Sequence, residues 1–214
     1  MWLLPLAAAR LTRGWQAAAG VAALLVLSSC VAAHGSAPGF ALLVGLVTLA
    51  MGLVIPRTTA AMMVVGLMLV HLAVPRLANS TLAQTYLTDG SWRHRMDIWA
   101  LALDLSRERP VLGYGFGNSD KIPARSGRMP LSGQPAVIPM YPHNVLMQAQ
   151  LELGLPGVFA LHGCWAWLVW RASRLRSLAR GSALALLAAG MGVWCVGYPL
   201  WRGSWVAWLY AVAI

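Results

Sequence analysis

The chain has 214 residues, of which 59% are hydrophobic and only 10% are charged, and its formal net charge is +10. Soluble globular domains carry about 25% charged residues. The composition therefore excludes a soluble fold and indicates an all-α integral membrane protein, a polytopic bundle of transmembrane helices. Basic loops beside membrane helices account for the positive charge, so we expect the lipid bilayer, and no nucleic acid, as a partner.

Three apolar stretches come first and indicate an N-terminal region of three transmembrane helices over residues 1–75. Each stretch lies near the lower limit of the roughly 17–25 residues that a membrane span needs. The stretches are Trp15–Ala33, Phe40–Ile55 and Thr59–Val74. The third is expected to stop at Pro75.

Residues 76–142 form a long polar segment that cannot lie in lipid. Within it, apolar residues at spacings of four, three and four predict an amphipathic helix over about residues 92–109. These residues are Trp92, Met96, Trp99 and Leu103. Charged residues on its other faces are typical of a helix on the membrane surface. Residues 118–141, rich in proline and glycine, are expected to form a loop over a functional site.

The C-terminal region, residues 143–214, holds further apolar stretches and brings the expected total to about five to six spans. They are Val145–Trp170, Ser182–Trp201 and Trp205–Ile214. The last is too short to cross a membrane, so the pattern indicates a chain that stops within a helix. Arginines in the short loops predict a cytoplasmic N-terminus and place residues 76–142 on the outer side.

Polar side chains gather where the chain re-enters the membrane. Asn144, Gln148 and Glu152 recur every four residues and share one helix face. A carboxylate is costly in lipid, so this face must point into the bundle or into a wet cavity. Substrate binding and a structural polar network both remain open for these residues. His143, beside them, suits proton transfer near neutral pH.

Two arginines open the predicted surface helix. The planar fork of Arg95 or Arg93 can donate two parallel hydrogen bonds to a phosphate, although a contact with solvent or a lipid headgroup is the alternative. A run of alternating glycines, Gly113 to Gly117, is interpreted as a tight turn back to the membrane. The histidines and cysteines show no ligand spacing, so no metal or cofactor is expected.

Four motifs, in this order, resemble the superfamily of O-antigen ligases, O-antigen polymerases and bacterial O-oligosaccharyltransferases. They are Arg95-x-x-x-Trp99, Pro110-x-x-Gly113-x-Gly115, His143-Asn144-x-x-x-Gln148 and Glu152-x-Gly154-x-x-Gly157. The flanking spans fit the C-terminal half of that fold.

The resemblance implies a metal-independent glycosyltransferase of the bacterial inner membrane, active in lipopolysaccharide or other polysaccharide biosynthesis. Such an enzyme moves a glycan from an undecaprenyl-diphosphate carrier to an acceptor at the periplasmic face. The acceptor can be the lipid A core, another glycan or a protein. The resemblance assigns general-base catalysis to His143 and diphosphate binding to Arg95. We expect substrate-binding roles for Arg93, Asn144, Gln148 and Glu152.

One departure keeps other interpretations open. The family carries a second arginine before a membrane span, in a Ser-Arg-Gly-like element, and the corresponding residues 35–40 here contain no arginine. Loss of one such contact in the transition state commonly lowers the rate by roughly 10²–10³. The alternatives are a degenerate, non-catalytic relative or assembly subunit, and a transporter with Asn144, Gln148 and Glu152 lining its pore.

Overall fold

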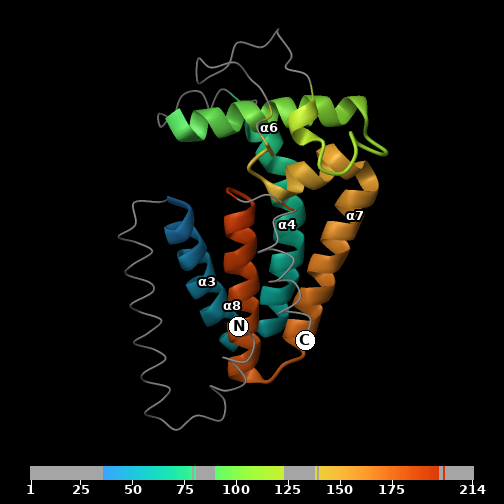
Figure 1. Ribbon diagram of the computed structural model, residues 1–214. Helices are drawn as coiled ribbons and strands as arrows, with labels where there is room; N and C mark the ends of the chain where they lie inside the picture. The colour runs from blue at the N-terminus through green and yellow to red at the C-terminus, as the bar shows by residue number, and fades with distance from the viewer. Residues whose placement is uncertain are drawn as a thin grey trace. The chain divides into compact units, whose positions relative to one another are not determined.

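The computed structural model describes residues 36–78, 80, 90–122, 138, 140–197 and 200, and every regular element among them is helical (Figure 1). The helices are α3 (Ser36–Val54), α4 (Pro56–Ala78), α6 (Gly90–Glu108), the 3-10 helix η1 (Ser119–Lys121), α7 (Val145–Ser173) and α8 (Ser177–Trp194). By length and composition, three of the described segments could cross a membrane. They are Pro56–Val74, Val145–Ser173 and Ser177–Trp194. The expected spans at residues 15–33 and 205–214 lie outside the described residues.

Several helix boundaries differ from the predicted ones. Helix α4 continues past Pro75 to Ala78, and the guanidinium of Arg76 donates a hydrogen bond to the Leu72 carbonyl. Helix α8 spans Ser177–Trp194, whereas hydropathy predicted Ser182–Trp201. Hydropathy reports which residues favour lipid, so it leaves out the polar first turn of α8.

The chain divides into two compact units, and α4 and α7 each contribute to both. The described part of the first unit comprises residues 36–64 and 165–193. Its helices α3 and α8 approach closely: a Cβ on Gly52 would lie 3.3 Å from the Cα of Gly181. Small residues permit such contact between membrane helices. Trp165 donates its indole N–H to the Met63 carbonyl at 3.1 Å and joins α7 to α4 within this unit.

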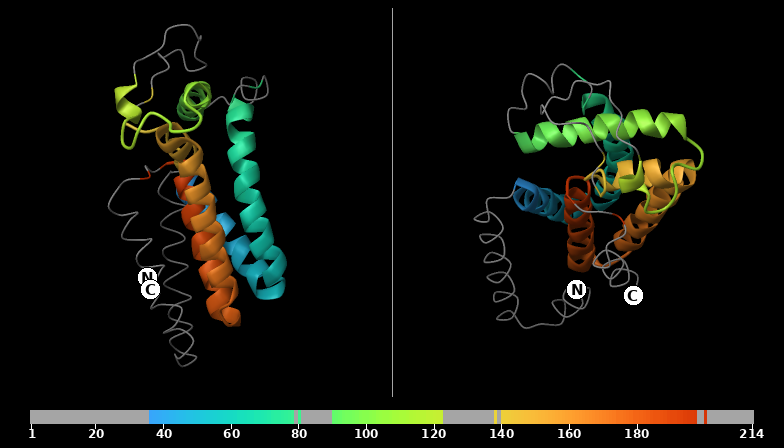
Figure 2. Two further views of the ribbon diagram at one scale, coloured as in Figure 1. Left: turned by 90° about the vertical axis from the view of Figure 1, so that its right-hand side faces the viewer. Right: turned by 45° about the horizontal axis from the view of Figure 1, so that its top comes forward.

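The second unit contains α6, the glycine-rich turn and the first half of α7. Helix α6 lies beside the first segment of α7 (Figures 1 and 2). Five consecutive α6 residues, Met96 to Ala100, are buried. Protein therefore covers this helix on more than one face, in contrast to the single apolar stripe predicted for a helix on the membrane surface. Asp97 is one of the charged residues outside that stripe, and yet it is only 2% exposed.

Candidate functional site

Asn144 begins helix α7 as its N-cap. Its Oδ1 accepts hydrogen bonds from the backbone N–H groups of Leu146 at 2.9 Å and Met147 at 3.2 Å. Asparagine is favoured at this position because its side chain satisfies amides that have no partner inside the helix. Among the described residues, Asn144 Nδ2 is the buried side-chain polar atom that lacks a hydrogen-bond partner. The Oδ1 of Asn144 thus caps the helix, and its Nδ2 is the side-chain atom that can bind a ligand.

His143 lies directly before this cap in a left-handed conformation, with φ of 53°. The preceding carbonyl, that of Pro142, accepts a hydrogen bond of 2.8 Å from the indole Nε1–H of Trp99 on α6. The ring of Tyr141 contacts the imidazole, with 4.5 Å between centroids, and the Tyr141 hydroxyl donates to the Gly197 carbonyl at 3.1 Å. The half-buried imidazole is therefore held between fixed neighbours.

The electrostatic surroundings of His143 come from α6. Burial of the imidazole lowers the pKa of His143 below its ordinary value, and the positive charges of Arg95 and His94 lower it further. Trp99, one turn after Arg95 on α6, donates to the carbonyl of the residue before His143. Arg95 and His143 therefore lie near each other although 48 positions of sequence separate them. At neutral pH the lowered pKa favours the neutral ring, the form that can accept a proton.

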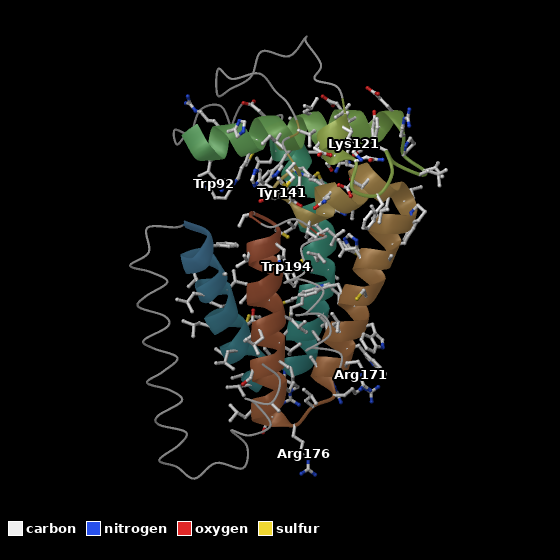
Figure 3. The ribbon with its side chains drawn as sticks, in the orientation of Figure 1. Trp92, Lys121, Tyr141, Arg171, Arg176 and Trp194 are labelled. Atoms are coloured by element: carbon white, nitrogen blue, oxygen red, sulfur yellow. The ribbon has the colours of Figure 1, made fainter. Side chains whose placement is uncertain are left out.

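Arg95 is ordered by its own helix. Its guanidinium carbon lies 5.3 Å from the ring centroid of Trp92, three residues earlier on α6. Trp92 and Tyr141 both lie below α6 in the view of Figure 3. Arg93, the second predicted phosphate ligand, is half-buried on the same helix, as is Arg95. The structure thus brings Arg95 and His143 together, and it adds His94, which the sequence analysis had not selected.

Helix α7 is broken at Gly154, which has non-helical angles of φ 62° and ψ −148°. The Leu155 amide, freed by the break, donates to the Pro110 carbonyl at 3.0 Å. Only glycine fits here without strain, because a Cβ on Gly154 would lie 2.8 Å from the Pro110 oxygen and 2.6 Å from the Val111 carbonyl carbon. The predicted continuous span is therefore two helical segments joined at a glycine.

The glycine-rich turn pairs with the backbone at this break. The amides of Tyr114 and Gly115 donate to the carbonyls of Leu151 and Glu152 at 2.9 and 2.8 Å. Gly113 permits this approach, since its Cβ would lie 2.6 Å from both of these carbonyl oxygens. Backbone groups left unpaired within a membrane are costly, so the turn stabilises the broken helix. This contact explains why both the turn and α7 have a glycine where their backbones meet.

Glu152 and Gln148 form a buried polar network with the same turn. Glu152 Oε2 accepts from the Gly117 amide at 2.8 Å, while Oε1 accepts from Ser119 Oγ at 2.5 Å and from Gln148 Nε2 at 3.0 Å. Gln148 Oε1 accepts from the Leu200 amide at 2.7 Å. The two side chains are 1% and 2% exposed. These contacts match the structural polar network that was one of the two interpretations left open for these residues.

A second polar pair, missed from the sequence, lies in the same unit. The rings of His71 and His162 stack with centroids 5.0 Å apart, and His71 Nε2 lies 3.0 Å from Gln150 Oε1. The histidines are 91 positions apart in the sequence. No spacing rule predicts a contact between residues this far apart in the sequence. The pair becomes visible only in the three-dimensional structure. The sequence signal was the presence of ionisable residues within apolar spans, which favours partners inside the bundle.

Comparison with known proteins gives one family. The family model described as O-antigen ligase matches residues 12–162. This range contains α6, the glycine-rich turn and the start of α7, and it therefore includes both Arg95 and His143.

Three curated relatives come from Rickettsia species and are each named "Putative polysaccharide ligase". The protein of Rickettsia conorii is 31% identical over 105 residues, which is 48% of this chain and 26% of the relative. Those of Rickettsia prowazekii and Rickettsia felis are 28% and 26% identical and cover 67% and 71% of this chain, but 36% and 38% of their own length. The chain thus spans well under half of these relatives. No solved structure matches it.

Proposed function

The chain belongs to the O-antigen ligase family, and from this premise we propose that it is part of a membrane glycosyltransferase of the polysaccharide-ligase type. Its donor is a glycan on undecaprenyl diphosphate, a lipid-linked sugar whose diphosphate remains at the membrane surface. Its acceptor is a hydroxyl group of a second glycan, of the lipid A core or of a protein. The polysaccharide-ligase names of the rickettsial relatives support this reaction class.

The observation that carries the proposal is that Trp99, one turn after Arg95 on α6, binds the carbonyl of Pro142, so that Arg95 and His143 lie at one site where the charge of Arg95 lowers the pKa of His143. A guanidinium fork matches the oxygens of a diphosphate, and a neutral imidazole matches a hydroxyl proton. No hydrogen bond joins either ring nitrogen of His143 to the described residues, so the imidazole can receive a substrate proton. The two groups can therefore serve opposite ends of one displacement reaction.

The reaction assigns one task to each residue. His143 accepts the proton of the acceptor hydroxyl, and the acceptor oxygen forms a bond to the anomeric carbon of the donor sugar. The bond between that carbon and the diphosphate oxygen breaks, and its electron pair leaves with the diphosphate. Arg95 stabilises the charge that develops on the leaving oxygen. Arg93 is assigned to the same diphosphate, and the free Nδ2 of Asn144 to a substrate oxygen near the imidazole.

The basic turn between α7 and α8 supports a periplasmic location for this site. Arg171 lies in the last turn of α7, and Arg174 and Arg176 lie in the turn that follows. Figure 3 labels Arg171 and Arg176 there. Arginine-rich short loops favour the cytoplasm. Helix α7 is long enough to cross a membrane, so its other end, where His143 lies, is assigned to the periplasm of a bacterial inner membrane.

Complementation tests the proposal in a full-length protein that contains this chain. A strain lacking its own ligase receives the wild type, His143→Gln or Arg95→Gln, and surface glycan is detected on a blot. Both variants are expected to lose the glycan while remaining in the membrane. Arg107→Gln is the matched control, because Arg107 lies on the same helix and pairs with Asp104 at 3.4 Å.

The control variant should retain the glycan. Full glycan from both site variants would overturn the proposal and favour a non-catalytic relative, in line with the missing second arginine at residues 35–40.

A further inference from the structure

Each residue that flanks the proposed base has a contact that fixes it. The Tyr141 hydroxyl binds the Gly197 carbonyl, the Pro142 carbonyl binds the Trp99 indole, and Asn144 caps α7. His143 lies between these contacts, and among the described residues the aromatic ring that contacts its imidazole is that of Tyr141. The position of the imidazole therefore depends on its neighbours in the backbone.

The backbone of His143 is in a region that residues with a Cβ adopt rarely. Its φ of 53° brings the Cβ toward a backbone oxygen, so the conformation is unfavourable outside glycine. Such a residue keeps this conformation only while surrounding contacts hold it, and these residues cluster at functional sites. Loss of one contact should let this segment adopt a more favourable backbone conformation, and this change should move the imidazole from its present position.

Trp99 supplies the contact from another helix. It is 3% exposed, and its indole has a single hydrogen-bond donor, which the Pro142 carbonyl accepts. Trp99 follows Arg95 by four residues on α6, so both side chains lie on one face of the helix. The rings of Trp99 and Trp92 contact each other in a T-shaped arrangement, with 6.4 Å between their centroids, and the guanidinium of Arg95 lies over the Trp92 ring.

We propose that Trp99 is a positioning residue of this site, which holds the Pro142 carbonyl and thereby fixes the left-handed His143 with its imidazole beside Arg95. Two residues of helix α6 then position the two groups: Trp92 positions the guanidinium of Arg95, and Trp99 positions the imidazole of His143. The consequence for catalysis rests on the proposed role of His143 as the base, whereas the consequence for the position of the imidazole does not.

The test compares two tryptophans that make the same bond. Trp99→Phe removes one indole donor, and Trp165→Phe removes the other, which binds the Met63 carbonyl within the first unit. Both indoles are buried, at 3% and 4% exposure. A second Trp99 variant carries 3-benzothienylalanine, which keeps the bicyclic ring and lacks the N–H. This variant preserves the packing if phenylalanine prevents folding.

Two measurements are made on the full-length protein in membranes. The first is carbethoxylation of His143 by diethyl pyrocarbonate, followed by mass spectrometry at about pH 8, where an ordinary imidazole is already neutral. The second is glycan transfer. Loss of one hydrogen bond corresponds to roughly a 2- to 10-fold effect, so both Trp99 variants should be labelled faster and transfer more slowly by about this factor. Trp165→Phe should change neither.

The outcomes separate the two proposals. Faster labelling in the Trp99 variants supports the positioning role even if His143→Gln retains transfer, a result that overturns only the proposed function. Labelling that equals the wild type in both Trp99 variants overturns the positioning role, whatever the transfer rate. A labelling change of equal size in Trp165→Phe overturns it as well, because the effect would then reflect general loss of stability.

Discussion

Gly117 donates its backbone N–H to the carboxylate of Glu152 across 35 positions of sequence, at 2.8 Å. The only carboxylate within the apolar span of α7 therefore holds the end of the glycine-rich turn. Since Ser119 and Gln148 donate to the other oxygen, each oxygen of Glu152 already has a donor from the protein. The carboxyl group of Glu152 thus stabilises the fold around the site.

The first prediction concerns this carboxylate. Glu152→Gln replaces one accepting oxygen with an NH2 group, which then faces a group that donates a hydrogen bond to Glu152 in the wild type. A buried polar group left without a partner costs about 1–3 kcal/mol. We expect a lower midpoint of thermal unfolding in detergent. Ser119→Ala removes a single donor and should cause a smaller decrease. Abolished transfer with an unchanged midpoint would instead indicate that Glu152 contacts the substrate.

The second prediction compares two glycines of α7. Gly154→Ala forces a residue with a Cβ into φ of 62° and against the carbonyls of Pro110 and Val111. A strained backbone of this kind costs about 1–3 kcal/mol before the steric clash is counted. Gly163→Ala is the control, since a Cβ there meets nothing within 4 Å. Unfolding should show a large loss of stability for Gly154→Ala and no loss for Gly163→Ala, because alanine in a helix interior is favoured over glycine by about 0.5–1 kcal/mol. Equal stabilities would contradict the described break.

The third prediction concerns the pH dependence of transfer. Burial and the charges of Arg95 and His94 lower the pKa of His143, so its imidazole stays neutral below the ordinary value of about 6.5. His94→Gln removes one positive charge, raises the pKa of His143 and should move the acidic limb of the activity profile to higher pH. Arg107→Gln, on the same helix, should leave the limb in place. A limb that does not move in His94→Gln would contradict the electrostatic contact.

Much of the helical content could be predicted from local patterns. The span predicted from Val145 and the helix predicted over residues 92–109 correspond to α7 and α6, because hydropathy and the 3.6-residue period are local properties. The burial of Asp97 and the break at Gly154 could not be predicted in this way. Gly154 resembles any glycine in an apolar helix, and only the docking of Pro110 and Val111 explains its conformation.

In the candidate site, too, some features could be predicted from the sequence and others depend on contacts between distant residues. Resemblance to a family selected Arg95 and His143, and the proton-accepting chemistry of an imidazole agreed with it. The contacts that position them were not visible: Trp99 appeared in the sequence as one member of an apolar stripe on a membrane-surface helix. In the structure its indole instead binds the carbonyl before His143. A hydrogen bond from a side chain to the backbone carbonyl of a distant residue leaves no spacing pattern in the sequence.

The central claim is that the guanidinium of Arg95 acts on the imidazole of His143, and titration of His143 tests it most directly. The full-length protein, with ¹³C-labelled histidine in nanodiscs, is titrated by NMR, and His143→Gln identifies the resonance. We predict that the pKa of His143 lies below its ordinary value in the wild type and rises in Arg95→Gln, while Arg107→Gln leaves it unchanged. An identical pKa in the wild type and in Arg95→Gln would contradict the claim.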